Sequence, residues 1–120
     1  MSLLVNTYTR GQSGDMVCLD PPNSWEELAG PESYRQKFYG SVAAKSLGLE
    51  MLPSLSSGDL YVESIAGLEM LQREAQQMLD NLGLFTSEAG ADYESLRPRI
   101  LNILAAVQRA IDVNGCVVIW

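Results

Sequence analysis

The chain contains no histidine among its 120 residues. Histidine is the usual general base near neutral pH, the commonest metal ligand and the base in most serine and cysteine nucleophile sites. Its absence excludes those catalytic arrangements, and the two cysteines are too few for a zinc site of the common type. The sequence therefore predicts no metal ion and no cofactor.

The two cysteines, Cys18 and Cys116, lie near opposite ends of the sequence. The opening residues, MSLLVNTYTR, carry no base before their apolar residues, unlike an export signal. No apolar run approaches the ~18 residues that cross a bilayer. Because disulfides persist in oxidising compartments, we expect a cytoplasmic protein with two free thiols and no membrane association.

Motifs that identify a reaction are also missing. The sequence has neither a P-loop nor a GxGxxG motif, and GQSGD (residues 11–15) lacks the spacing of a nucleophile elbow. A pair of carboxylates is enough for glycoside hydrolysis, but the fifteen acids offer no preferred pair. We therefore predict a non-catalytic protein and keep a small enzyme that uses carboxylates as an alternative.

Basic residues are scarce in the middle of the chain. The formal net charge is -7, and residues 48–96 hold nine acids but a single base, Arg73. Such a field repels nucleic acid and anionic membranes, which bind proteins through lysine and arginine. A basic protein partner is the natural complement, and an acidic surface that only confers solubility is the alternative.

The length and apolar content fit a single domain over residues 1–120. Alternating residues at 3–10, the turn GQSG and a second apolar run at 15–20 predict a β-hairpin that Pro21-Pro22 ends. DLYVES, residues 59–64, predicts a third strand that leads into a helix.

Short helical segments and a loop are predicted between the hairpin and the third strand. Ser24 is placed to cap one helical turn. Pro31 suits the first turn of a helix that Gly40-Ser41 interrupts, and Ser41 is placed to cap the helical turn that follows. Residues 47–58 predict a loop whose apolar side chains lie against the core.

Two long amphipathic helices are predicted over residues 65–82 and 93–113, where apolar side chains recur at helical spacing. Asn114-Gly115 provides a left-handed exit from the second helix. The apolar ending, residues 116–120, then predicts a strand covered on both faces. The predicted fold is α+β in the order β-β-α-β-α-α-β, with a mostly antiparallel sheet of three or four strands packed by the two long helices.

The predicted binding surface is the outer face of the first long helix together with acids in flanking loops, because complementary fields speed association and discourage wrong partners. Glu69 and Arg73, four residues apart with the acid first, also predict a helical ion pair. The predicted partner-binding residues are Glu69, Arg73, Gln76, Asp80, Glu50, Glu88 and Asp92.

Two other interactions are open alternatives. A small-ligand binding module would have its pocket under the 47–58 loop, lined by Tyr34, Phe38 and Tyr61. A homodimer could form through an exposed edge strand of the hairpin.

Two segments carry a resemblance. DLYVESIAGLEMLQREAQQML and RILNILAAVQRAIDVNGCVVIW look like parts of small acidic bacterial proteins of uncharacterised function, of the toxin–immunity or mobile gene-cassette type. The resemblance covers about half of the chain and implies an immunity-like or antitoxin-like inhibitor. It has no motif from which a functional residue can be transferred.

Overall fold

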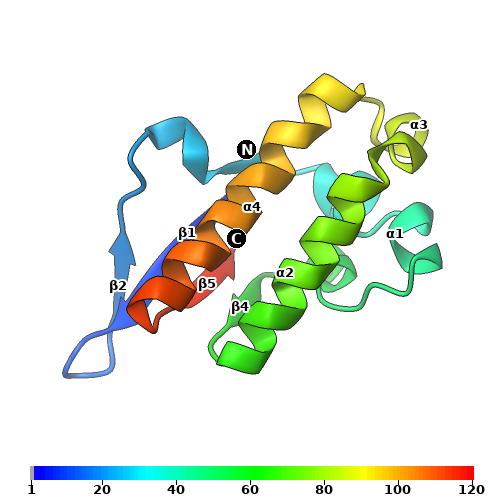
Figure 1. Ribbon diagram of the computed structural model, residues 1–120. Coiled ribbons are helices and arrows are strands. Elements are labelled where there is room, and N and C mark those ends of the chain that lie inside the picture. Colours follow the sequence, from blue (N-terminus) through cyan, green and yellow to red (C-terminus); the bar gives the residue numbers. More distant parts are fainter. Residues whose placement is uncertain (1) are drawn as a thin grey trace.

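A computed structural model describes residues 2–120. Five antiparallel strands form one sheet, α4 (Tyr93–Val113) lies across this sheet, and α2 (Ile65–Asp80) packs beside α4 (Figure 1). This arrangement confirms the predicted α+β class and the two long helices. The strands are β1 (Ser2–Arg10), β2 (Met16–Leu19), β3 (Leu28–Pro31), β4 (Leu60–Val62) and β5 (Cys116–Ile119).

The sheet has the order β2-β1-β5-β4, and β3 also pairs with β1. The sequence did not predict β3, so the sheet has five strands and not the expected three or four. Pro31 ends β3 instead of beginning a helix. Gly30 has a φ of 116°, and a Cβ there would lie 2.3 Å from a ring carbon of Tyr34, so only glycine fits. β3 pairs with the first residues of β1 and β2 pairs with the last, both on the edge opposite β5.

The final strand, β5, is an interior strand between β1 and β4, as the sequence predicts. Val117 and Ile119 belong to the core between sheet and helices, and Val118 on the other face is also fully buried. Asn114 leaves α4 with a φ of 54°, which confirms the predicted left-handed exit.

Short helices fill the remaining connections. They are η1 (Ser24–Glu27), the π-helix η2 (Arg35–Tyr39), α1 (Val42–Ser46), η3 (Leu52–Ser56), η4 (Leu82–Leu84) and α3 (Thr86–Ala89). The hydroxyl of Ser41 caps α1 by accepting the Ala44 N–H at 3.1 Å, as predicted for the break at Gly40-Ser41. Leu52 and Leu55 are fully buried, so the 47–58 segment does lie against the core.

The two cysteines are free thiols. Both lie opposite Tyr8 in the sheet, Cys18 on β2 and Cys116 on β5, so a whole strand separates them. No helix in residues 2–120 has the length and apolar character needed to cross a membrane.

Removal of residues 118–120 should abolish the cooperative thermal melt followed by circular dichroism. The deletion takes away Val118 and Ile119, each fully buried and each worth roughly 1.5 to 3 kcal/mol. It also leaves β1 and β4 without the strand that joins them. Removal of Trp120 alone, which is 36% exposed, should keep a cooperative melt with a lower midpoint. A cooperative melt of the longer deletion would show that β5 is dispensable.

Candidate functional site

Five of the nine acids in residues 48–96 hold other groups of the fold in place, so the acidity of this segment is partly structural. Their carboxylates accept hydrogen bonds from backbone N–H groups or from tyrosine and arginine side chains. These acids are Asp59, Glu63, Glu74, Glu88 and Asp92.

Glu74 is the most deeply buried of these acids, with 5% of its surface exposed. From α2, its carboxylate accepts the backbone N–H groups of Glu50 at 2.9 Å, Met51 at 3.1 Å and Leu52 at 3.0 Å. These donors are at the start of η3, where the first N–H groups have no partner within the helix. A carboxylate there also interacts favourably with the helix dipole. Nothing in the sequence indicates this role, because Glu74 has the position of an ordinary acid on the flank of an amphipathic helix.

Arg35 is the counterpart of Glu74 at the other end of the same loop. Its guanidinium donates to the carbonyls of Leu55 at 3.1 Å and Gly58 at 2.7 Å, and to the carboxylate of Asp59 at 2.7 Å. A cation thus holds carbonyl groups at the end of η3, and an anion holds N–H groups at its start. The 47–58 segment is fastened at both ends by charge-assisted hydrogen bonds.

Two of the predicted binding residues cap helices. Glu88 accepts the Val42 N–H at 3.0 Å, at the first residue of α1. Asp92 is the N-cap of α4 and accepts the Ser95 N–H at 3.0 Å. The hydroxyl and the backbone N–H of Ser95 hold the pKa of Asp92 below its ordinary value of 3.8. Both carboxylates thus have a structural use.

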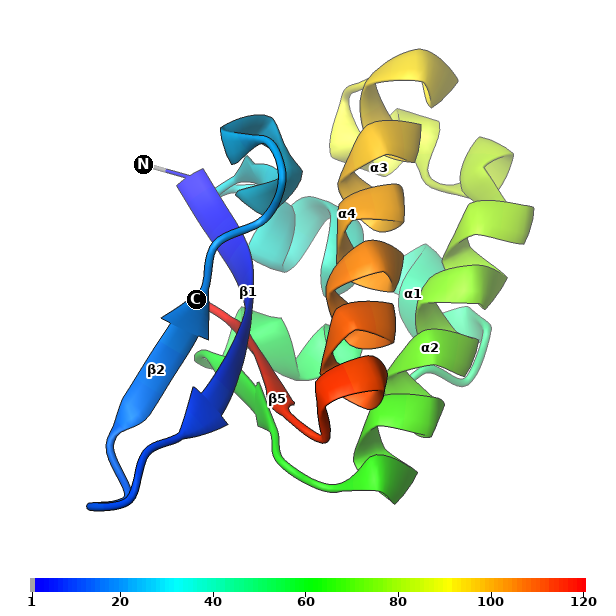
Figure 2. The same ribbon diagram turned by 60° about the vertical axis from the view of Figure 1, so that its left-hand side comes forward.

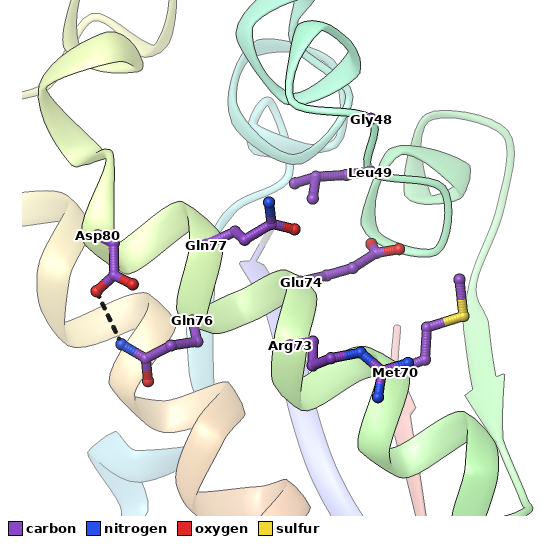
Figure 3. A pocket seen from close by; sticks show the side chains of 8 residues that line it. All are labelled: Gly48, Leu49, Met70, Arg73, Glu74, Gln76, Gln77 and Asp80. Carbon is purple, nitrogen blue, oxygen red and sulfur yellow. Dashed lines mark hydrogen bonds between the residues drawn. The ribbon is translucent and has the colours of Figure 1, made fainter.

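A groove of about 380 Å³ runs between α2 and the segment that follows α1 (Figure 3). It brings together Arg73, Gln76 and Asp80 of the predicted surface, and the Gln76 side-chain amide donates to the Asp80 carboxylate at 2.9 Å. The groove is completed by residues that the prediction omitted: Gly48, Leu49, Met70, Glu74 and Gln77. Met70, Arg73 and Gln77 follow helical spacing, which is the signal that could have found them.

Two further members of the predicted surface are chain neighbours of groove residues. Glu50 follows Leu49 directly in the chain, and Glu69 precedes Met70. The predicted ion pair between Glu69 and Arg73 does not form, since no oxygen and nitrogen of the pair come within 4.0 Å. The Arg73 guanidinium is left at the groove without a carboxylate partner among residues 2–120. We call Glu50, Glu69, Arg73, Gln76 and Asp80 the α2 surface.

The residues predicted for the alternative pocket do not meet around a cavity. Tyr34 and Phe38 are buried in an aromatic cluster, with ring centroids 5.3 Å apart, and Phe38 also packs edge-on against Phe85. Tyr61 is 49% exposed and faces away from the helices, because its strand neighbour Val62 points into the core. The groove near the 47–58 loop is lined by other residues.

The outer face of the sheet has its own cluster of polar and reactive groups. Glu63 accepts hydrogen bonds from the Tyr8 hydroxyl and from Arg10, and the Arg10 guanidinium lies 5.4 Å from the centre of the Tyr8 ring. Burial and the Glu63 carboxylate raise the pKa of both Tyr8 and Cys116. Both groups therefore stay protonated near neutral pH, which disfavours their use as nucleophiles.

Comparison of the chain with protein-family models, with curated proteins and with solved structures found no match. The resemblance to small bacterial proteins of the toxin–immunity or gene-cassette type therefore stays a prediction. The α2 surface and the groove beside α2 are the features of the structure that bear on function.

Substitution of Glu74 by alanine should lower the free energy of unfolding by about 3 kcal/mol, because three N–H groups at the start of η3 lose a charged acceptor. Urea denaturation would measure the change. Glu69→Ala is the matched control on the same helix, and its exposed side chain should change the free energy by less than about 0.5 kcal/mol. Equal effects of the two substitutions would contradict the anchoring role of Glu74.

Asp92→Asn should make stability less sensitive to acid. The pKa of Asp92 is lower in the folded than in the unfolded chain, so its ionised form stabilises the fold above pH 3.8. That contribution is lost as the pH falls through the folded pKa. Asparagine still caps the helix but does not titrate. The melting temperature of the variant should therefore fall less steeply between about pH 5 and pH 2 than that of the wild type. Glu94→Gln is the control, and an unchanged slope for Asp92→Asn would contradict the cap's ionic contribution.

Proposed function

We propose that this protein is a non-catalytic binding protein that recognises a basic segment of a partner protein through the α2 surface and its groove. The observation that carries the proposal is a set of acids on the α2 surface whose charge no base in residues 2–120 neutralises. Glu50 and Glu69 have no salt bridge within residues 2–120, and Asp80 is bonded only to the neutral amide of Gln76.

The groove suits a long basic side chain. Leu49 and Met70 provide apolar surface for the methylene stem of a lysine or arginine, whose charged end prefers a polar surrounding. Asp80 and the amides of Gln76 and Gln77 supply acceptors for that charged end. A volume of about 380 Å³ is near the lower end of the range for binding pockets, enough for one or two side chains.

An inhibitor of the immunity or antitoxin kind is the biological form that we propose for this binding. An inhibitor must associate quickly with its target and discriminate against other proteins. A surface on which acidic residues are clustered serves both needs when the target is basic. The charge pattern of residues 48–96 supports this proposal, as does the resemblance of the two long segments.

A small anionic ligand in the same groove is a second candidate. Arg73 favours it, since its guanidinium borders the groove without a carboxylate partner in the described chain. The two candidates respond in opposite directions to Arg73→Gln. Loss of this positive charge should strengthen binding of a basic peptide and weaken binding of a small carboxylate.

The test uses a set of fluorescein-labelled twelve-residue peptides, each with four lysine or arginine residues, and matched peptides with glutamine at those positions. Basic peptides should bind, and their dissociation constants should rise about tenfold between 30 and 300 mM salt. Fluorescence anisotropy measures both. Glu69→Lys combined with Asp80→Lys should weaken binding at least about tenfold at low salt.

The control variant combines Glu94→Lys with Asp112→Lys. It changes the net charge by the same amount, and Asp112 accepts the Gln108 amide at 2.9 Å just as Asp80 accepts that of Gln76. Both variants should keep a cooperative melt. If the two variants weaken binding equally, or if glutamine peptides bind as well as basic ones, the α2 surface is not the recognition site.

A further inference from the structure

The β2 strand is a free edge of the sheet. It pairs with β1 on one side, and no other strand in residues 2–120 lies on its other side (Figure 2). All four of its residues, Met16 to Leu19, are apolar, and none of them is buried; the Val17 side chain is 43% exposed. A short apolar strand is therefore open along its backbone.

The hydrogen-bond pattern shows which backbone groups face this open side. Leu4 and Trp120 exchange two backbone hydrogen bonds, at 2.8 and 3.0 Å. The backbone N–H and C=O groups of the even-numbered residues of β1 therefore point toward β5. The odd-numbered residues of β1 turn toward β2, in agreement with the bond from the Gly11 N–H to the Asp15 carbonyl at 2.8 Å. In β2 the residues between these bonded pairs are Met16 and Cys18, opposite Arg10 and Tyr8. Their N–H and C=O groups point away from β1.

Natural edge strands are commonly blunted by a lysine, a proline, a bulge or very short length. The opposite edge of this sheet follows that rule, because β4 has three residues and only Tyr61 turns its backbone outward. The β2 strand has no lysine and no proline, and its pairing with β1 has no register shift. The N–H and C=O groups of Met16 and Cys18 are therefore free to form the backbone hydrogen bonds of an added strand.

Acids mark both ends of this edge. Asp15 precedes β2 and Asp20 follows it, and both are exposed. The Ser13 hydroxyl, which donates to Asp15 at 2.5 Å, lowers the pKa of that carboxyl. In a two-fold antiparallel pair of β2 strands, the Asp15 end of each copy would lie beside the Asp20 end of the other, so like charges would meet at both ends of the pair and oppose a second copy. A strand with a base at each end is complementary instead.

We infer that the β2 edge binds an extended segment of another protein as an added strand: about four residues rich in valine, threonine or tyrosine, flanked on both sides by lysine or arginine. The main-chain ladder supplies affinity, and the bases opposite Asp15 and Asp20 supply specificity. β2 and α2 lie on opposite sides of the molecule (Figures 1 and 2), so this site is separate from the α2 surface and does not rest on the function proposed for it.

The probe is the peptide acetyl-KKTVTVKK-amide, and amide hydrogen exchange followed by NMR is the first readout. Exchange of the Met16 and Cys18 N–H groups should slow on peptide addition, whereas the outward N–H of Tyr61 should exchange as before. A peptide with N-methyl groups on alternate residues has the same charge and side chains but cannot complete the ladder. It should bind at least tenfold more weakly.

The protein variants separate the ladder from the charges. Cys18→Pro removes an outward N–H that β1 does not use, so the fold should keep its cooperative melt while the peptide binds at least tenfold more weakly. Asp15→Lys combined with Asp20→Lys should weaken binding of the lysine peptide. The same variant should strengthen binding of a peptide that has glutamates at the lysine positions. This second variant leaves the backbone groups of Met16 and Cys18 in place.

Three results would overturn the inference. Equal binding of the N-methylated peptide would show that no ladder forms. Sedimentation of the protein alone as a dimer that Cys18→Pro disperses would show that a second copy occupies the edge. Loss of KKTVTVKK binding in the Glu69→Lys and Asp80→Lys variant, with β2 intact, would place the peptide on the α2 surface.

Discussion

The buried carboxylate of Glu74 is the interaction on which the helical half of the structure depends. It holds three N–H groups at the start of η3, while Arg35 holds two carbonyls and a carboxylate at its end. The segment between these anchors supplies Leu52 and Leu55 to the core and leads directly into β4. It also begins at the wall of the groove. Two opposite charges thus connect the loop, the sheet edge and the candidate site.

The acidic character of residues 48–96 has two origins that composition alone does not separate. Asp59, Glu63 and Glu74 serve hydrogen-bond networks, and Glu88 and Asp92 cap helices. What remains around the α2 groove is a smaller set of acids, together with the single base of the segment. This reduces the predicted binding surface from seven residues to five. Three of them line the groove, and Glu50 and Glu69 are chain neighbours of residues that line it.

The sequence predicted the elements whose signals are local or strongly periodic. The Ser41 cap, the Asn114 exit, the two long helices and the apolar β5 belong to this group, because propensity and burial agree in each of them. β3 was missed because Leu28–Pro31 is short and contains both glycine and proline. Glu74 was missed because its donors lie more than twenty residues away in the chain. The groove was half predicted, since helical spacing shows which residues share a face but not which loop crosses it.

The pairing of β1 with β5 has a consequence for how the chain acquires its structure. Leu4 and Trp120 exchange two hydrogen bonds, and Asn6 accepts a further one from the Trp120 indole at 2.9 Å. During synthesis β1 therefore cannot pair with β5 until the end of the chain has been made, whereas the helices can form from local contacts as they emerge. Non-local pairing of this kind slows folding, because the entropy cost of closing a long loop comes before the favourable free energy of the contacts between β1 and β5. Until then the apolar residues of β1 lack their central neighbour, and this interval is when the nascent chain is most exposed to aggregation.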